Sequence, residues 1–472
     1  MPAALSRESW NDQARRLGYR HQCFIGNRFV SAASGKTFTC TNPATGKPLT
    51  QVSAGDKEDV DRAVKAARAA FEKGVWSRTA GAERSKVLLR LADLMEKHAT
   101  ELALLETLDV GKPIADSSSV DVPLSIQCIR RHAEAIDKIH DEIGPTAPNA
   151  ISLIRREPLG VVGAVIPWNF PLLTGCWKIG PALATGNSMV VKPAEQSPLT
   201  MLRLAELAAE AGVPEGVFNV IPGYGEAAGQ ALGRHMDVDA ITFTGSTGGK
   251  TPNIIMADAP DLDAAAEAAA WGIFFNQGEV CNAGSRLIVE ESVKDAVLEK
   301  IRKVAQSLQP GDPLDPKTKM GAMVDETQMN RVLAYIESGA KEGARLAFGG
   351  KRVRSETGGY YIEPTVFDGV KSSMKIAQEE IFGPVLSTIT FKDQAEAVKI
   401  GNDTIYGLAA AVWTSDINKA FKISAALRAG VVWVNCFDNG HISSRFGGFN
   451  QLASAATSRC WRWTKYTQMK AM

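Results

Sequence analysis

The chain has 472 residues, with 53 Lys and Arg against 52 Asp and Glu, so its formal net charge is +1. Apolar residues make up 45% and charged residues 22%, as in ordinary soluble globular proteins. This balance excludes a protein that binds the phosphate backbone of nucleic acids, which needs a basic face. It also excludes a protein with a long acidic, solvent-exposed tail. At roughly 150 residues per domain we expect about three domains. A chain of this size needs no disulfide or metal to stabilise its core.

The cysteines and histidines suggest no metal or disulfide site. Seven cysteines lie far apart without a C-x-x-C pair, and six histidines show no ligand spacing. The N-terminus lacks the apolar region of a signal peptide, and the most apolar stretch, 161–191, is interrupted by prolines and lysine. We therefore expect a cytoplasmic protein without metal, nucleic-acid or membrane partners.

The first 140 residues alternate between short strands and longer helices. Phe24–Val30 and Thr37–Thr41 have β-like composition. Lys57–Lys73 places its apolar residues on one face of a helix, and Glu83–Leu105 and Val120–Ile139 continue this 3.6-residue pattern.

Four apolar runs then follow at intervals of 23 to 28 residues: Val161–Ile166, Met189–Lys192, Val217–Ile221 and Ala240–Thr244. An amphipathic helix, Leu199–Ala211, separates two of them. This rhythm predicts βαβ units, hence a parallel sheet in an α/β fold. A second α/β region follows, in which Asp258 is expected to cap an Ala-rich helix that begins near Pro260 and continues through Phe275, with a strand at Ser285–Glu290.

Ligands of parallel sheets bind beyond the carboxyl ends of the strands. The glycines of Gly223-Tyr224-Gly225 follow the third run and suit a phosphate loop, although an ordinary strand-to-helix turn explains them equally well. Cys281 lies in a Gly-flanked loop between a helix and a strand, where an activated thiolate would be exposed. A single cysteine is also commonly buried and inert, so both interpretations stay open.

Six ordered motifs then show a family resemblance. They are Pro167-Trp168-Asn169-Phe170-Pro171, Lys192-Pro193-Ala194-Glu195, Phe243-Thr244-Gly245-Ser246-Thr247, Asn276-Gln277-Gly278-Glu279-Val280-Cys281, Glu379-Glu380-Ile381-Phe382-Gly383-Pro384 and Phe446-Gly447-Gly448-Phe449. From about residue 20 to its end the chain resembles the NAD(P)-dependent aldehyde dehydrogenases. The resemblance implies oxidation of an aldehyde, expected to be an ω-amino or γ-glutamylamino aldehyde of polyamine catabolism, to its acid.

The resemblance also implies residue roles. Cys281 would be the nucleophile, Asn169 would donate to the oxyanion, and Lys178 would line the catalytic tunnel. The cofactor would contact Ile166, Trp168, Lys192, Glu195, Gly225, Gly245, Ser246, Glu380 and Phe382. Among these, Lys192 and Glu195 would hold the adenosine ribose, where an acidic group favours NAD over NADP.

The implied architecture is aldehyde dehydrogenase-like. A Rossmann-type cofactor domain would comprise residues 1–138 and 159–247, and an α/β catalytic domain residues 248–446. A small β oligomerisation arm would comprise 139–158 and 460–472, with a homodimer or homotetramer as the assembly. The terminal strand, Lys465–Lys470, would pair across subunits.

Two segments depart from the family pattern. After Thr247 roughly twenty residues are absent, about one helix and one strand. With them go the helix that would receive the cofactor pyrophosphate and the glutamate that serves the family as general base for deacylation. The second departure is the stretch 452–463, whose preserved length between matching flanks is typical of two compensating frameshifts.

These departures leave alternative hypotheses. The first is a working aldehyde dehydrogenase. The second is a degenerate member that retains at most nucleotide binding or oligomerisation. A third is a CoA-acylating semialdehyde dehydrogenase, which dispenses with the base.

Overall fold

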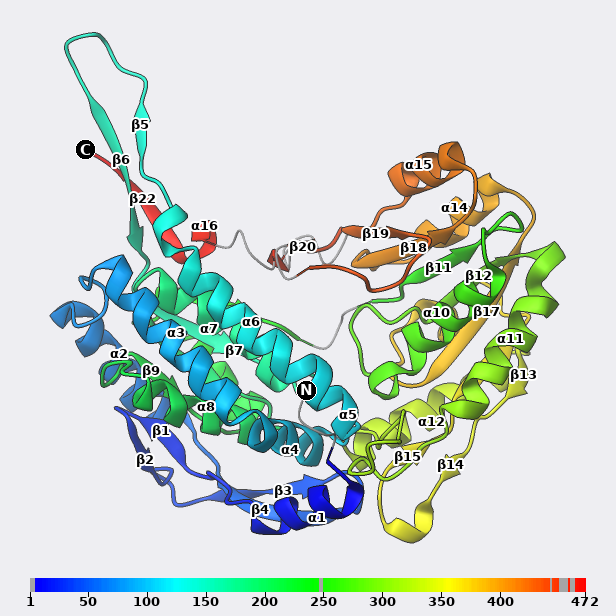
Figure 1. The fold of residues 1–472 in the computed structure, drawn as a ribbon, viewed down its shortest axis with the longest axis horizontal. Coiled ribbons are helices and arrows are strands. Elements are labelled where there is room, and N and C mark those ends of the chain that lie inside the picture. Colours follow the sequence, from blue (N-terminus) through cyan, green and yellow to red (C-terminus); the bar gives the residue numbers. More distant parts are fainter. Residues whose placement is uncertain (1–4, 246–248, 442–443, 450–456, 459–462) are drawn as a thin grey trace.

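The structure is a computed structural model that describes residues 5–245, 249–441, 444–449, 457–458 and 463–472. Figure 1 shows two α/β lobes side by side and a β arm that projects from the first lobe and carries the C-terminus. The helices are α1 (Arg7–Arg16), α2 (Lys57–Lys73), α3 (Gly81–Lys97), α4 (Ala99–Val110), α5 (Ile114–Asp116), α6 (Val122–Glu134), α7 (Pro171–Ala184), α8 (Leu199–Glu210), α9 (Gln230–Gly233), α10 (Leu262–Phe274), α11 (Lys294–Ser307), α12 (Glu326–Lys341), α13 (Lys375–Gln378), α14 (Gln394–Asn402), α15 (Ile417–Ala426) and α16 (Trp463–Tyr466).

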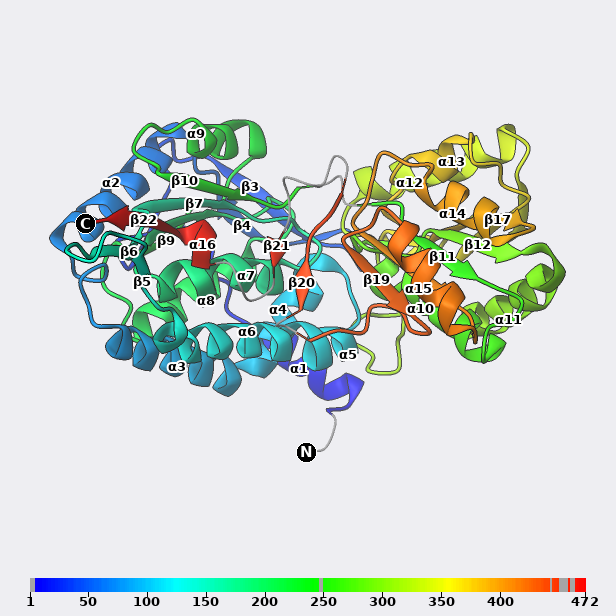
Figure 2. The same cartoon turned by 90° about the horizontal axis from the view of Figure 1, so that it is seen from above.

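The first lobe contains a six-stranded sheet in the order β10-β7-β8-β9-β1-β2. Its strands are β1 (Cys23–Ile25), β2 (Arg28–Val30), β7 (Val161–Val165), β8 (Ser188–Lys192), β9 (Phe218–Val220) and β10 (Ala240–Phe243). Strands β7 to β10 are parallel, which confirms the predicted βαβ rhythm. Figure 2 shows α2 and α9 on one face of the sheet and α7 and α8 on the other. Strands β7 and β8 are almost wholly buried between these layers.

The second lobe contains a seven-stranded sheet in the order β13-β16-β17-β12-β11-β18-β19. Its strands are β11 (Pro252–Ile255), β12 (Arg286–Glu290), β13 (Arg345–Phe348), β16 (Thr365–Asp368), β17 (Val385–Phe391), β18 (Ala409–Trp413) and β19 (Val431–Val434). All pairings are parallel except that of β13 with β16. Two-stranded ladders are formed by β3 (Thr37–Asn42) with β4 (Lys47–Ser53), β14 (Arg352–Val353) with β15 (Tyr361–Ile362), and β20 (Arg445–Phe446) with β21 (Thr457–Ser458).

Eight residues, 244–251, connect β10 to β11. This connection is too short to hold a further helix and strand. Within the described part of the chain, β10 is therefore the last strand on its side of the sheet. Its Ile241 and Phe243 side chains are 43% and 63% exposed.

The arm is a three-stranded sheet of β5 (Glu142–Gly144), β6 (Ser152–Pro158) and β22 (Thr467–Ala471). Strand β22 pairs antiparallel with β6 of the same chain, from Thr467 opposite Pro158 to Ala471 opposite Ile154. Strand β22 stands at the edge of this sheet, with β6 as its one neighbouring strand among the described residues, so the expectation that the Lys465–Lys470 strand pairs across subunits stays a prediction.

Three predicted elements differ in detail. Phe24–Val30 is a hairpin, β1 and β2, because Gly26 and Asn27 adopt positive φ of 58° and 56° and form a turn. The predicted helix Glu83–Leu105 is two helices, α3 and α4, with His98 between them at φ −101° and ψ 20°. Asp258 does not cap α10.

The cap of α10 is Asp261, whose side chain accepts hydrogen bonds from the Asp263 and Ala264 amides. Its extended backbone, at φ −150°, points the carboxylate at these free N–H groups. Asp258 instead accepts from Thr414 Oγ1 and Lys419 Nζ at 2.9 and 2.8 Å.

A buried carboxylate gives the first lobe a predictable response to pH. Asp109 Oδ1 accepts from Cys40 Sγ and its Oδ2 from the Leu199 amide, each at 2.8 Å. Burial raises the pKa of Asp109 to about 7. In the unfolded chain an aspartate titrates near pH ~4, so the native state binds more protons between about pH 4 and 7. The stability contributed by this group is therefore highest at low pH and falls as the pH rises through that window.

We expect Asp109→Asn to remove this part of the pH dependence. The free energy of unfolding of the variant should fall less between about pH 5 and 7 than that of the wild type, by up to ~1.4 kcal/mol per pH unit. Urea titrations at several pH values measure both slopes, with Asp12→Asn at an exposed position as the control. Parallel slopes for Asp109→Asn and the wild type would contradict the assignment.

Candidate active site

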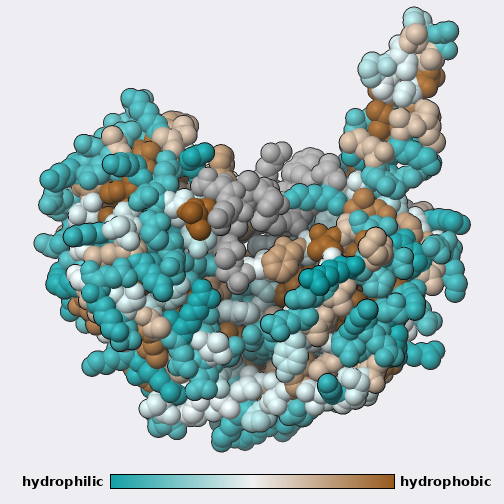
Figure 3. All heavy atoms as spheres, turned by 180° about the vertical axis from the view of Figure 1, so that it is seen from behind, coloured by the Kyte–Doolittle hydropathy of each residue, from teal (hydrophilic) through white to brown (hydrophobic). Residues whose placement is uncertain are grey.

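A cavity of about 860 Å³ is lined by residues of both lobes. Figure 3 shows apolar side chains (brown) on the two lobes to either side of the region between them. Nine of the predicted site residues line this cavity: Ile166, Trp168, Asn169, Lys192, Glu195, Gly225, Gly245, Cys281 and Phe382. In sequence these positions are up to 216 residues apart, from Ile166 to Phe382, and the two folded sheets bring them together.

The loop after α10 places Cys281 at the cavity. Asn276, Gln277 and Gly278 have left-handed backbones with φ of 47°, 55° and 74°. A Cβ atom on Gly278 would lie 2.2 Å from the Gly383 carbonyl oxygen, so only glycine fits there. Such strain persists where the surrounding structure enforces it, commonly at functional sites. Here it turns the chain so that the half-buried Cys281 lines the cavity.

The same loop is fixed from behind by two buried side chains that we did not predict. Gln277 Oε1 accepts from the Gly321 amide at 3.0 Å, and Glu279 Oε1 accepts from the Val324 amide at 3.1 Å. Burial raises the pKa of Glu279 well above its ordinary value, because desolvation disfavours the charged carboxylate. The two contacts hold the Cys281 loop to the segment 321–324.

Asn169 connects this loop to the first lobe. It follows β7 directly before α7, and its Nδ2 donates to the Glu279 carbonyl oxygen at 2.8 Å. The amide nitrogen has two N–H groups, so one remains to meet an oxygen in the cavity. The structure therefore joins an amide donor from the first lobe to the loop that carries Cys281, and both residues line the cavity.

The cavity lining also contains residues expected to contact a dinucleotide. Lys192 Nζ lies 2.8 Å from Glu195 Oε2, directly after β8. Trp168 and Phe382 form an edge-to-face pair with ring centroids 5.2 Å apart. Phe382 has a left-handed φ of 58°, and Gln328 Nε2 fixes its carbonyl at 2.7 Å. A ribose and a flat ring can be held by these two pairs.

Three predicted residues are not part of the described lining. Lys178 is buried on α7 and donates from Nζ to Thr244 Oγ1. Glu380 is buried, and its Oε1 accepts from the Gly249 amide at 3.0 Å. Ser246 lies outside the described residues, as do the Thr247–Gly248 junction and most of the unusual stretch 452–463.

The sequence did not reveal an aromatic wall of the cavity. Trp177 pairs with Phe446 at 6.1 Å between centroids, and Phe170 stacks with Phe275 at 6.4 Å. Phe437 lines the same cavity, next to Asp438. These residues come from separate elements, so a linear motif would not have grouped them.

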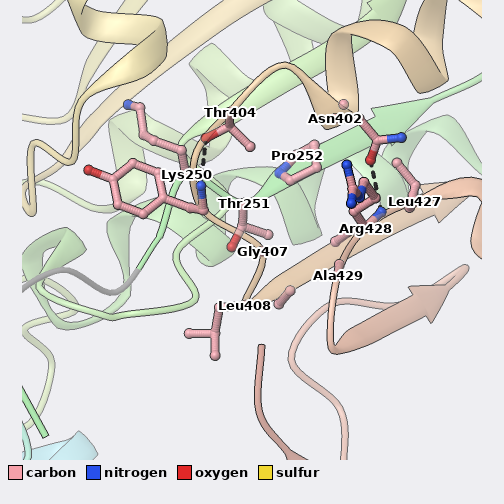
Figure 4. A pocket seen from close by; sticks show the side chains of 14 residues that line it. Lys250, Thr251, Pro252, Asn402, Thr404, Gly407, Leu408, Leu427, Arg428 and Ala429 are labelled. Atoms are coloured by element: carbon pink, nitrogen blue, oxygen red, sulfur yellow. Dashed lines mark hydrogen bonds between the residues drawn. The ribbon is translucent and has the colours of Figure 1, made fainter. Parts of the chain in front are cut away.

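A second hollow lies at the start of β11, beside Lys250 and Arg428 (Figure 4). Its volume of about 10 Å³ holds a single water at most. Desolvation lowers the pKa of the fully buried Lys250 to about 7, assisted by the neighbouring Arg286. This space is too small for a substrate.

Within the described ranges, no group of three His, Cys, Asp or Glu side chains is placed to hold a metal ion. No helix in the described parts of the chain has the length and apolar content needed to cross a membrane.

Comparison with known proteins identifies the fold. Residues 29–472 match the aldehyde dehydrogenase family. The chain belongs to this family. It is 45% identical over 485 residues to the NADP/NAD-dependent aldehyde dehydrogenase PuuC of Escherichia coli. This alignment covers 98% of the present chain and 97% of PuuC. It is 46% identical over 495 residues to the aminoacetaldehyde dehydrogenase of Pseudomonas aeruginosa, with coverages of 100% and 99%. The gamma-glutamyl-gamma-aminobutyraldehyde dehydrogenase of Burkholderia cenocepacia superimposes with a TM-score of 0.97, at 50% identity and 99% coverage of both chains.

Membership in this family establishes that the chain has the α/β aldehyde dehydrogenase fold. It also establishes that the protein is an oxidoreductase that acts on aldehydes with NAD(P). The relatives are enzymes over their full length, so the comparisons give no support to the hypothesis of a degenerate member. The alignment with the aminoacetaldehyde dehydrogenase has 495 positions against 472 residues here, so at least 23 positions have no counterpart in this chain.

Proposed function

We propose that this aldehyde dehydrogenase oxidises an aldehyde to its carboxylic acid through a covalent intermediate on Cys281. The observation that carries the proposal is the bond from Asn169 Nδ2 to the Glu279 carbonyl, which joins an amide donor to the loop that presents Cys281. A cysteine thiolate is the strongest side-chain nucleophile near neutral pH, and acyl chemistry needs hydrogen-bond donors for the oxyanion.

In the first step the Cys281 thiolate adds to the aldehyde carbon and forms a thiohemiacetal. The carbonyl oxygen becomes an oxyanion, which accepts hydrogen bonds from Asn169 Nδ2 and the Cys281 backbone amide. When bound, NAD would accept a hydride, that is, one proton with two electrons, from the thiohemiacetal carbon as the C=O bond re-forms. Cys281 then carries the acyl group as a thioester. Water attacks this thioester, releases the acid and returns the thiolate.

In the family a glutamate acts as the general base for the hydrolytic step, and this glutamate has no counterpart in the present sequence. A spectrophotometric assay with NAD and propionaldehyde separates the two chemical steps, because NADH forms before hydrolysis. We expect continuous NADH formation. One equivalent of NADH per active site, followed by no further turnover, would show that hydrolysis fails. No NADH from a protein with a normal melting curve would contradict the proposal.

Two pairs of cavity residues would hold the two ends of NAD. Lys192 and Glu195, which form an ion pair, would contact the adenosine ribose, and the paired rings of Trp168 and Phe382 would contact the nicotinamide side. In the described residues of the connection 244–251 there is no helix whose N-terminus could meet the pyrophosphate, so the contacts to the two ends of NAD would carry more of the binding. We propose NAD rather than NADP because a 2′-phosphate would meet the Glu195 carboxylate.

Replacing Glu195 tests the cofactor choice. In Glu195→Gln the carboxylate that repels a 2′-phosphate is gone, so we expect KM for NADP to fall by about tenfold and KM for NAD to rise a few-fold. Steady-state kinetics with both cofactors measure this ratio. Glu210→Gln, on the exposed end of α8, is the matched control and should leave the ratio unchanged. An unaltered ratio in Glu195→Gln would assign cofactor choice to other residues.

We propose an ω-amino or γ-glutamylamino aldehyde of polyamine catabolism as the substrate. The names of the relatives from P. aeruginosa and B. cenocepacia support this class. We also propose that the chain forms a homodimer or homotetramer through its arm, whose Ile143, Ile151 and Met469 side chains are 76%, 75% and 60% exposed. Six cysteines are free thiols in the described residues, which supports a reducing, cytoplasmic setting.

We further propose the domain division that the family resemblance implies. Residues 1–138 and 159–247 form the cofactor domain, 248–446 the catalytic domain, and 139–158 with 460–472 the arm. The separation of strands supports it, since β7 to β10 belong to one sheet, whereas β11 to β13 and β16 to β19 form the other large one.

A further inference from the structure

The residues that lead into β11 lie against the loop that carries Cys281. The described chain resumes at Gly249 after the connection from the first lobe, and the Gly249 amide donates to Glu380 Oε1 at 3.0 Å. A Cβ atom on Gly249 would lie 2.9 Å from the Cys281 carbonyl oxygen, so the two backbones are packed directly together. The position of Gly249 therefore affects two residues that we assign to the reaction, Glu380 and Cys281.

A buried arginine fixes the residues that follow Gly249. Arg286 is the first residue of β12, and its side chain is fully buried. Its Nε donates to the Lys250 carbonyl oxygen at 2.9 Å, and its backbone amide donates to the Thr251 carbonyl oxygen at 3.2 Å. Two hydrogen bonds therefore join Arg286 to the segment between Gly249 and β11.

The other end of the same guanidinium is bound to the end of α14. Its Nη1 donates to the Ile400 and Asp403 carbonyl oxygens at 3.1 and 3.3 Å, and its Nη2 to that of Gly401 at 2.9 Å. The last carbonyls of a helix lack partners within the helix and carry partial negative charge, so a cation suits this place. Desolvation lowers the pKa of Arg286 to about 10, which leaves the group charged near neutral pH.

The number of these contacts explains why the residue is an arginine. A guanidinium has five N–H groups in a planar fork and can serve four carbonyls on two different elements. A lysine ammonium has three N–H groups on one nitrogen atom, so it cannot reproduce all four contacts. Arg286 is not among the described residues that line the active-site cavity. Any effect it has on the reaction must therefore pass through other residues.

We propose that Arg286 is a positioning residue, which holds Gly249 in place through the carbonyl of Lys250. Gly249 in turn fixes the Glu380 carboxylate by its amide and supports the Cys281 backbone by contact. This inference rests on the proposed function, with the cofactor at Glu380 as the family resemblance implies, and adds a residue outside the cavity. Misplacement of reacting groups by ~1 Å can lower a rate by about a hundredfold, so such an anchor has a measurable effect.

Arg286→Lys tests the proposal, because it keeps the positive charge at the end of α14 and removes the fork. We expect kcat to fall about tenfold and KM for NAD to rise about threefold, since the Glu380 carboxylate is then less well fixed. A smaller folded fraction would lower kcat but would leave KM for NAD unchanged, so KM separates positioning from a loss of folded protein. Steady-state kinetics well below the melting temperature measure both constants.

The matched control is Asn402→Ala, at the same end of α14. Asn402 Nδ2 donates to the Ala426 carbonyl oxygen at 2.9 Å, and its Oδ1 accepts from the Arg428 amide at 2.8 Å (Figure 4). These bonds join α14 to the end of α15 rather than to the residues before β11. We expect a lower melting temperature and unchanged kinetic constants. Equal kinetic changes in the control and in Arg286→Lys, or no change in Arg286→Lys, would overturn the proposal.

A double variant tests whether Arg286 acts through Gly249. In Gly249→Ala the added Cβ atom would be too close to the Cys281 carbonyl oxygen, so the contact must shift and kcat should fall. If both residues act along one path, the loss of kcat in the double variant should be smaller than the product of the two single losses. Losses that multiply would mean that the residues act independently, and would overturn the proposal.

Hydrogen exchange tests the anchor separately from turnover. The Gly249 amide is protected by its bond to Glu380, so mass spectrometry of a peptide that spans Gly249 reports on this contact. We expect faster exchange in Arg286→Lys and wild-type exchange in Asn402→Ala. If the wild type oxidises no aldehyde but exchange is faster in Arg286→Lys, the proposed function fails and the anchoring of Gly249 stands. Unchanged exchange in Arg286→Lys would overturn the role of Arg286 whatever the activity.

Discussion

Cys281→Ala is expected to lower aldehyde-dependent NADH formation by at least about a thousandfold, because removal of a covalent nucleophile leaves only the residual effect of binding and the oxyanion donors. The smaller side chain lies at the cavity surface, so the melting temperature should stay close to that of the wild type. Initial rates with saturating NAD measure the loss.

Cys436→Ala is the matched control. This thiol is also half-buried, but it is not among the described residues that line the cavity. It should keep full activity. If Cys436→Ala were the inactive variant and Cys281→Ala the active one, the assignment of the nucleophile would be wrong.

Lys112→Met is expected to destabilise the protein by about 3–5 kcal/mol, because it leaves buried carboxylates without their cation. Lys112 Nζ lies 2.6 Å from Asp121 Oδ2 and 4.0 Å from Glu106 Oε1, and all three side chains are at most 1% exposed. The same ammonium lies 3.9 Å from the centroid of the Phe170 ring, which lines the active-site cavity. Urea unfolding measures the change, and activity should fall together with stability.

Burial raises the pKa of Glu106 to about 8 despite the nearby Lys112, so this carboxyl is protonated near neutral pH. Asp121 is then the principal partner, and the double variant Lys112→Met with Asp121→Asn should recover part of the lost stability. Lys65→Met is the control, since its ion pair with Asp61 is on the surface and adds little to stability. A loss no larger than that of the control would show that the buried pair contributes little.

Much of the backbone arrangement followed from local patterns in the sequence. The runs that became β7 to β10 were found because each is apolar throughout and flanked by turns, as expected for strands covered on both faces. The helix α2 was predicted with its observed bounds, since its apolar period and its glycine end are local signals. The cap at Asp261 was missed because Asp258 stands three positions before it, and only the folded backbone decides which of the two faces the free amides.

The site residues likewise fall into those that the sequence predicted and those that only the folded structure reveals. Positions in motifs after strands, such as Asn169 and Lys192, could be placed because strand ends converge at one edge of a parallel sheet. Glu279 was visible only as a neighbour of Cys281, and its bond to the Val324 amide depends on a segment far along the chain. Asp438 and the aromatic wall depend on contacts between elements, for which the sequence has no period or spacing.

The end of the first sheet at β10 has a consequence for handling the protein. In the described part of the chain β10 is paired on one side only, with β7, and it presents Ile241 and Phe243 to solvent. A strand with a free backbone edge and exposed apolar side chains is a template for strand addition by another molecule. Aggregation should therefore rise with protein concentration from this side of the first lobe, and a lysine at position 241 or 243 should improve solubility without entering the active site.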